Sequence, residues 1–208
     1  MNLETVNRAE AMSGRSAPRS SCRVAAPGVA LVGALNGPRH RRALQVFLVV
    51  VLAHWGEHLL QAYQTYVLGW PTGRALGGLG LCFPWLVKSE WLHYGYNLTV
   101  LSGLALLLPG FTGRARTWWR AALAVQGWHY LEHAFLLAQV LLGVNLFGRA
   151  VPTSVLQLWV PRLELHQFYN AIVLAPIVVG FFLQRRRWVS SPLAGIELGR
   201  RGGRLGAT

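Results

Sequence analysis

The sequence predicts an all-α membrane protein, a four-transmembrane-helix bundle built from two tandem two-helix repeats. Three observations predict this fold. Apolar residues make up 53% of the 208 residues and are concentrated between about residues 43 and 183. This region contains four apolar runs long enough to cross a bilayer, and a short polar motif recurs in it at a nearly constant offset. We therefore expect a multi-pass protein of the cell membrane.

The predicted spans are each close to or above the ~20 residues that a membrane helix needs. They cover about residues 43–69, 85–109, 115–143 and 161–184. The first two form repeat 1, about 43–109, and the last two form repeat 2, about 115–184, within a four-helix transmembrane domain over 41–188. The apolar stretch 25–35 is too short to span a membrane, so we expect residues 1–40 to be a flexible basic tail and 189–208 a second flexible tail.

The charge distribution predicts the orientation of the bundle. The formal net charge is +13, from 20 Lys and Arg against seven Asp and Glu. Arginine clusters flank the predicted spans on one side only: Arg39, Arg41, Arg42, Arg114, Arg116, Arg120, Arg185, Arg186 and Arg187. Because cytoplasmic loops of membrane proteins carry the excess of Lys and Arg, both termini should be cytoplasmic. No aromatic-interleaved basic motif accompanies the charge, so we expect no nucleic-acid partner.

A polar motif is written twice within the apolar runs. His54-Trp55-Gly56-Glu57-His58 recurs as His129-Tyr130-Leu131-Glu132-His133, and the His93 to Asn97 segment recurs as His166 to Asn170. The offsets are 75 residues (54 to 129) and 73 residues (93 to 166). Ionisable groups inside a membrane are costly, so this cluster marks a functional site.

The spacing suits a metal. Positions i, i+3 and i+4 of a helix share one face, so each His-x-x-Glu-His motif points three polar groups to one side. Counting along the predicted spans puts all the motifs at one depth, in the outer half of the membrane. The candidate metal ligands are His54, Glu57, His58, His93, Asn97, His129, Glu132, His133, His166 and Asn170, and the candidate catalytic residues are Glu57 and Glu132.

The types of candidate ligand residue limit which metals or cofactors the site can bind. Imidazole suits iron, copper and zinc, whereas soft sulfur ligands are scarce, with two Cys and two Met in the chain. We expect iron or copper, with zinc as a further candidate, in a dinuclear centre or in a single site with alternating partners. A b-type haem between two facing histidines is the alternative cofactor.

Two families share parts of this pattern. His-x-x-Glu-His is the zinc motif of inverted-zincin peptidases, but a peptidase needs one such motif and this chain has two. A buried membrane histidine cluster also resembles that of the histidine-box desaturases and hydroxylases. Their box spacings are not reproduced here, so no residues are carried over from that family.

The function that these features favour is that of a membrane metal-dependent oxidoreductase acting on a lipophilic substrate. Its expected partners are a lipophilic small molecule or oxygen, membrane lipids, and either an electron-donor protein or a second copy of the chain. A metal or proton carrier without catalysis is the alternative.

The two repeats differ beside the motif. Gly56 and Gly95 stand where repeat 2 has Leu131 and Phe168, so we expect repeat 1 to line the substrate pocket and repeat 2 to be packed shut. The apolar connections 70–84 and 144–160 are either lids or interfacial anchors.

Overall fold

The computed structural model describes residues 27–189, which form an all-α fold with seven α-helices and, within that range, no strand. The helices are α2 (Pro27–Asn36), α3 (His40–Tyr66), α4 (Gly77–Cys82), α5 (Pro84–Val87), α6 (Glu90–Leu107), α7 (Gly113–Leu142) and α8 (Arg162–Val189). Two 3₁₀ turns, η1 (Leu108–Gly110) and η2 (Leu156–Leu158), lie in the connections. The remainder of both expected tails, 1–26 and 190–208, lies outside the described residues.

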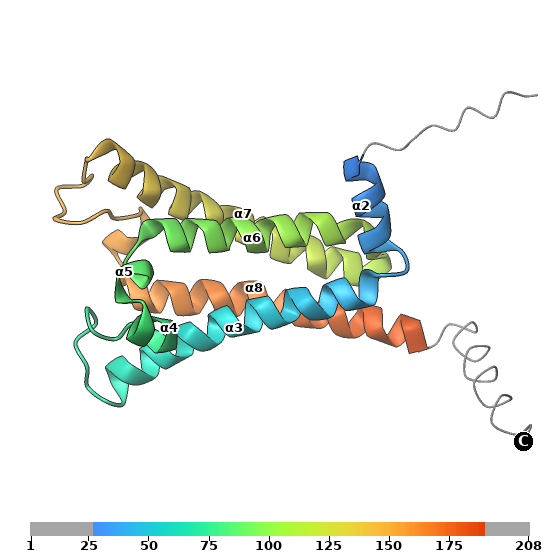
Figure 1. The fold of residues 1–208 in the computed structure, drawn as a ribbon, viewed down its shortest axis with the longest axis horizontal. Helices are drawn as coiled ribbons and strands as arrows, with labels where there is room; N and C mark the ends of the chain where they lie inside the picture. Colours follow the sequence, from blue (N-terminus) through green and yellow to red (C-terminus); the bar gives the residue numbers. More distant parts are fainter. Residues whose placement is uncertain (1–26, 190–208) are drawn as a thin grey trace, which may run out of the picture.

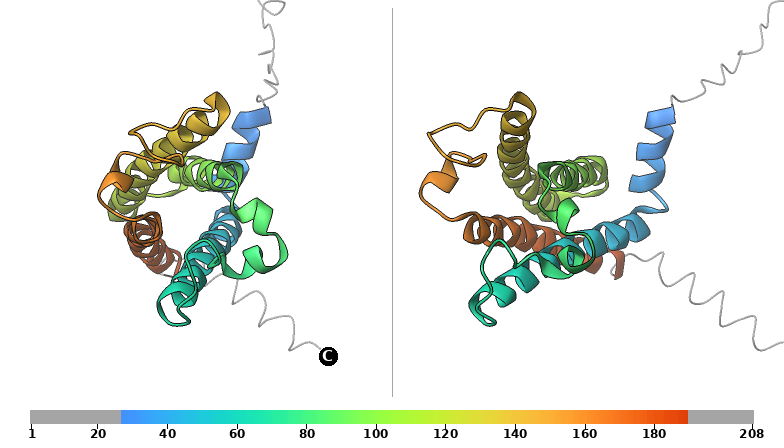
Figure 2. Two further views of the ribbon diagram at one scale, coloured as in Figure 1. Left: turned by 90° about the vertical axis from the view of Figure 1, so that its left-hand side faces the viewer. Right: turned by 60° about the vertical axis from the view of Figure 1, so that its left-hand side comes forward.

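The long helices α3, α6, α7 and α8 form a closed bundle (Figure 1). Helix α3 packs on α6 and α8, and α7 packs on the same two helices from the other side. Viewed end-on in Figure 2, the four helices surround one interior. Both ends of the described chain lie at one end of the bundle, as an even number of crossings requires.

The two ends of the bundle differ in character. The end that we call the loop end carries α4, α5 and the 143–161 connection (Figure 1). The opposite end, here called the arginine end, holds the starts of α3 and α7 and the last turns of α8, and so gathers the arginines at 39, 41, 42, 114, 116, 120, 185 and 186. From the sequence, the Pro-Gly pair in Leu108-Pro109-Gly110 is expected to end the second long helix. The three residues form η1 directly after α6, at the arginine end.

One sequence expectation is corrected at the arginine end. Residues 27–36 were expected in a flexible tail, but they form α2. The helix is docked by Asn36, whose Nδ2 donates to the Leu106 carbonyl at 2.7 Å and whose Oδ1 accepts from the Gly110 amide at 2.7 Å. A short apolar stretch therefore becomes ordered because tertiary hydrogen bonds hold its C-terminal end.

Two helices, α3 over His40–Tyr66 and α8 over Arg162–Arg186, are long and apolar enough to cross a membrane by length and composition. Within residues 27–189, α6 and α7 do not meet that criterion. All four long helices nevertheless expose large apolar side chains, including Val49 (66%) on α3, Leu98 (40%) on α6, Leu131 (59%) on α7 and Phe168 (55%) on α8.

The interior at the arginine end is apolar. Trp119 is fully buried there, stacks on Phe111 with 4.1 Å between ring centroids, and donates its indole N–H to the Leu104 carbonyl at 2.8 Å. Around it lie the other members of this core, among them Leu44, Phe47, Val51, Val100, Ala115, Val173 and Ile177. A packed apolar core therefore lies between the polar residues of the repeated motif and the arginine end.

We expect Trp119→Ala to lower the free energy of unfolding by about 3–5 kcal/mol, because it leaves a large cavity and removes the indole hydrogen bond to the Leu104 carbonyl. Denaturant titration of the detergent-solubilised chain, followed by circular dichroism, measures this loss. The matched control is Trp118→Ala, since Trp118 is 42% exposed and its removal should cost under about 0.5 kcal/mol. Equal losses in both variants would contradict a core centred on Trp119.

Candidate metal centre

Six histidines from all four long helices converge in the half of the bundle nearer the loop end. His54 and His58 come from α3, His93 from α6, His129 and His133 from α7, and His166 from α8. Ring centroids lie 4.5 Å apart for His54–His58, 5.3 Å for His58–His166, 5.7 Å for His93–His133 and 5.0 Å for His133–His166. The convergence expected from helical phase is thus confirmed.

Three of the six form the tightest group. The ligand atoms of His129, His133 and His166 all lie within 4.8 Å of one another, and the three side chains are buried. His133 Nε2 is 3.2 Å from His129 Nε2 and 3.1 Å from His166 Nε2. This buried cluster could hold a metal ion.

Hydrogen bonding alone does not account for this arrangement. A ring nitrogen offers either one N–H or one lone pair, yet His133 Nε2 has two nitrogen neighbours. Nitrogens that are each about 2.0–2.1 Å from one ion stand roughly 3.0–3.4 Å apart at metal angles of about 90–110°. The two separations at His133 Nε2 fall in that range, and the ligand atoms of His129 and His166 lie within 4.8 Å of each other, so a single cation could be held by the three rings.

The opposite ring nitrogens are held in the manner expected of metal ligands. His166 Nδ1 lies 2.7 Å from the Arg162 carbonyl, and His93 Nδ1 lies 3.0 Å from the Ser89 carbonyl. Because a carbonyl can only accept, Nδ1 must carry the proton in both rings, which leaves Nε2 as a lone pair facing the cluster. Each bond runs from residue i to residue i−4, so the same side-chain-to-backbone hydrogen bond orients this histidine in both repeats.

Tyrosine rings position the first histidine of each repeat. Tyr96 stacks on His54 with 3.8 Å between centroids, and Tyr169 stacks on His129 at 4.5 Å. The Tyr169 hydroxyl accepts from Trp128 Nε1 at 2.7 Å, whereas the Tyr96 hydroxyl donates to the Val50 carbonyl. The repeats therefore share the stack and differ in what fixes the tyrosine.

The two candidate catalytic glutamates occupy different surroundings. Glu57 turns to the loop end, where its carboxylate accepts from the amides of Gly78 at 2.7 Å and Leu79 at 3.1 Å. It thereby fastens the start of α4. Glu132 is 8% exposed, and its Oε1 has no hydrogen-bond partner among residues 27–189. The Glu132 carboxylate nevertheless interacts with the side chains of Tyr169 and Ser154 and with the Leu156 backbone. Both glutamates therefore contact the connection that follows their helix, and the unpaired Oε1 is what sets Glu132 apart.

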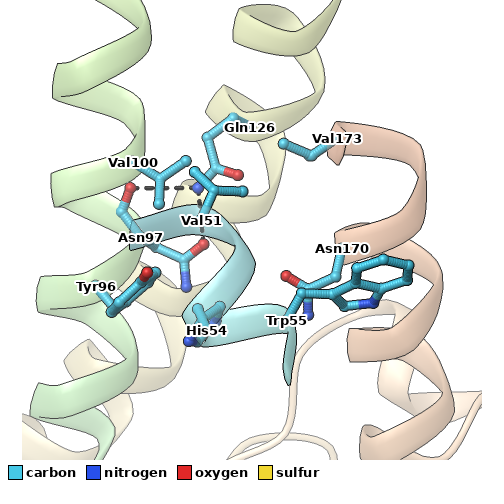
Figure 3. A pocket seen from close by; sticks show the side chains of 9 residues that line it. All are labelled: Val51, His54, Trp55, Tyr96, Asn97, Val100, Gln126, Asn170 and Val173. Atoms are coloured by element: carbon cyan, nitrogen blue, oxygen red, sulfur yellow. Dashed lines mark hydrogen bonds between the residues drawn. The ribbon is translucent and has the colours of Figure 1, made fainter. Parts of the chain in front are cut away.

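The two asparagines lie one helical turn below the histidines. Asn97 and Asn170 donate Nδ2 to the carbonyls of His93 and His166, at 2.9 and 2.8 Å. Asn97 Oδ1 also accepts from Gln126 Nε2 at 2.8 Å (Figure 3). With His54, these amides line a cavity of about 10 Å³, close to the size of one water molecule. Asn97 is thus committed to hydrogen bonds within the bundle.

Several site residues were not found from the sequence. Gln126 has no counterpart in repeat 1, where Val51 stands, so the repeat did not reveal it. The ion pair between Arg162 and Glu90, at 2.5 and 2.7 Å, joins the starts of α8 and α6. Gln61 lies 2.9 Å from His58 Nδ1 through its Oε1. These partners are either distant in sequence or one helical turn away, and they do not recur in the other repeat. Comparing the two repeats therefore does not reveal them.

Both outer connections fold back and are tied to the bundle. Gln64 accepts from the Gly77 amide at 2.8 Å, and Gln139, its equivalent in repeat 2, donates to the Thr153 carbonyl at 3.0 Å. Beneath these connections, a cavity of about 640 Å³ at the loop end reaches His58, His93 and His166. The cluster is therefore covered by the loops but can be reached from that end.

The fold and site define an all-α protein with a buried histidine cluster that could hold a metal. No protein-family model, curated protein or solved structure matches the chain.

We expect Glu57→Ala to release α4 while leaving the histidine cluster intact. The amides of Gly78 and Leu79 should exchange with deuterium about tenfold faster, because each loses a charge-assisted hydrogen bond worth roughly 1.5 kcal/mol or more. Exchange mass spectrometry over residues 74–87 measures this effect. Glu57→Gln, which keeps one acceptor, is the matched control and should show a smaller increase. Unchanged exchange together with lost metal would instead place Glu57 among the ligands.

Proposed function

We propose that this chain is a multi-pass membrane metalloprotein, an oxidoreductase that uses a histidine-ligated iron or copper centre on a lipophilic substrate. The observation that carries the proposal is the buried group of His129, His133 and His166. His54, His58 and His93 complete a second set beside it. Ring centroids of the two sets lie 5.3–5.9 Å apart, which supports a dinuclear centre.

The membrane setting is supported by the inverted polarity of the bundle. Apolar side chains such as Val49 and Leu131 face outward, while His133 (1% exposed) and His166 (5% exposed) are inside. A bundle that is apolar outside and polar inside is stable where the surroundings are hydrocarbon. The arginine end then lies in the cytoplasm, and the histidine cluster lies in the outer half of the bilayer.

Redox chemistry is favoured by the nature and accessibility of the ligands. Nitrogen-rich sites suit iron and copper, and zinc remains a further candidate metal. His58, His93 and His166 border the large cavity at the loop end, so a small oxidant such as oxygen has a route to one side of the centre. When bound, the metal supplies the electron-transfer chemistry. The electrons come from the lipophilic substrate or from a donor protein.

The competing functions are less well supported. A carrier needs a polar path to the cytoplasm, but the interior below the cluster is packed with apolar side chains such as Leu104 and Trp119, both at 0% exposure. A haem needs a flat space between two axial histidines. The close contacts of His133 with His129 and His166 leave no such space in the tightest group.

The test is metal analysis of the full chain purified in detergent. We expect one or two iron or copper atoms per chain and an optical spectrum without a Soret band. His133→Ala should weaken metal binding by more than about 100-fold, beyond the range for loss of an outer-shell partner. Oxygen uptake with a lipophilic reductant should fall in parallel.

The control variant is His40→Gln, because His40 lies at the arginine end beside Phe111, far along the bundle from the cluster. It should retain its metal. A Soret band would replace the proposal with a haem protein, and full metal loading in His133→Ala would remove the three-histidine group as the binding site. Metal without oxygen uptake under any lipophilic reductant would favour the carrier.

A further inference from the structure

A second cavity, of about 200 Å³, lies on the flank of the bundle between α3, α6 and the α4–α5 segment. Its inner wall is formed by His54, His58 and His93, which belong to repeat 1. The rest of its lining is mostly apolar and includes Ala53, Leu76, Leu79, Val87 and Leu92. The cavity thus joins an apolar chamber to imidazole nitrogens.

The two repeats differ at the entrance to this cavity. The residue directly before the first histidine is Ala53 in repeat 1 and Trp128 in repeat 2. Ala53 is exposed and lines the cavity. Trp128 reaches across to the Tyr169 hydroxyl at 2.7 Å and so covers the tyrosine that stacks on His129. Repeat 1 therefore has the small methyl group of Ala53 at the position where repeat 2 has the indole of Trp128.

This finding corrects the sequence explanation of the asymmetry. Gly56 and Gly95 were expected to leave room for the pocket, and a Cβ at either position would indeed meet no atom within 4 Å. Neither glycine lines the 200 Å³ cavity. The room comes from Ala53 instead.

The α4 side of the cavity, here called its roof and formed by Leu76 and Leu79, is held in place against α3 by hydrogen bonds. Leu76 and Leu79 flank Gly77 and Gly78, the residues that Gln64 and Glu57 tie to α3. Gly77 has φ 73°, and a Cβ there would collide with the Glu57 carboxylate. The roof can therefore approach α3 this closely only with glycine at 77. The cavity is a built feature of α3, α4 and the connection between them.

We propose that this cavity binds an alkyl chain, with the end of the chain placed against His54, His58 and His93. Apolar walls recognise methylene groups by burial, and the polar lining consists of the three histidines together with Glu57, Gln61 and Tyr96. The proposal rests on the membrane metalloprotein function, because a flank opening at Ala53 then faces lipid and admits the chain sideways. The alkyl chain belongs to a membrane lipid or to a free lipophilic molecule, and these two sources share the same recognition chemistry.

The test is photolabelling of the full-length protein in phospholipid vesicles. One arm uses a phospholipid with a diazirine at the end of an acyl chain, and the other uses a free diazirine-bearing fatty alcohol. We expect labels on residues 76–96, which include the roof and the α6 wall. Labelling in the first arm identifies a lipid chain as the occupant, and labelling in the second arm alone identifies a free molecule.

Ala53→Trp copies repeat 2 and should reduce labelling of this segment about tenfold, which corresponds to roughly 1.4 kcal/mol of lost binding. The matched control is Val49→Trp, one turn away on α3 at a site 66% exposed and outside the cavity lining, which should label as the parent does. Unreduced labelling in Ala53→Trp, or no label on residues 76–96 in either arm, would overturn the proposal.

Labelling does not require metal, so the outcome of this test is independent of the metal analysis. A protein that labels here but binds no metal keeps the pocket and loses the proposed oxidoreductase, whereas a metal-loaded protein without label loses the pocket alone.

Discussion

Burial of six imidazoles inside one helical bundle is the constraint on which the rest of this structure depends. An unpaired buried polar group costs roughly 1–3 kcal/mol, and within residues 27–189 His133 Nδ1 is left without a hydrogen-bond partner. The i−4 carbonyls of Ser89 and Arg162 hold the outer nitrogens of His93 and His166. The inner nitrogens are left facing one another, 3.1–3.2 Å apart at His133. That arrangement could hold a shared cation.

The same constraint divides the bundle into two halves. At the arginine end, Trp119 and Phe111 anchor a packed apolar core that needs no partners other than side-chain contacts and one indole hydrogen bond. Towards the loop end, the interior carries buried polar side chains, from the amides of Asn97 and Gln126 to the histidines, beside buried leucines such as Leu136 and Leu165. The loops then close this half, since Glu57 and Gln64 in one repeat and Gln139 in the other hold the returning chain. A hydrated or reactive interior is thereby confined to one end.

Duplication of a two-helix unit supplies two matching ligand sets, and local divergence gives them different surroundings. The stacked pairs His54–Tyr96 and His129–Tyr169 are alike. Ala53 and Trp128, which precede the paired histidines, are not. Trp128 closes the flank of repeat 2, while repeat 1 keeps a 200 Å³ chamber against its histidines. One set is enclosed and the other adjoins a space for a ligand, so a symmetric framework provides an asymmetric site.

By itself the sequence determined the all-α class, the four long helices, the turn at Leu108-Pro109-Gly110 and the meeting of six histidines, because helical periodicity and hydropathy are local properties of the chain. It did not determine which polar groups would face the cluster. Glu57 and Glu132 have identical motif positions, yet Glu57 binds the amides of Gly78 and Leu79, whereas the Glu132 carboxylate interacts with Tyr169, Ser154 and the Leu156 backbone. Nor did it reveal that Asn36 would order α2, or that Ala53 rather than Gly56 would leave the pocket open. These outcomes depend on contacts between residues distant in sequence, and only the packing of helices and returning loops decides them.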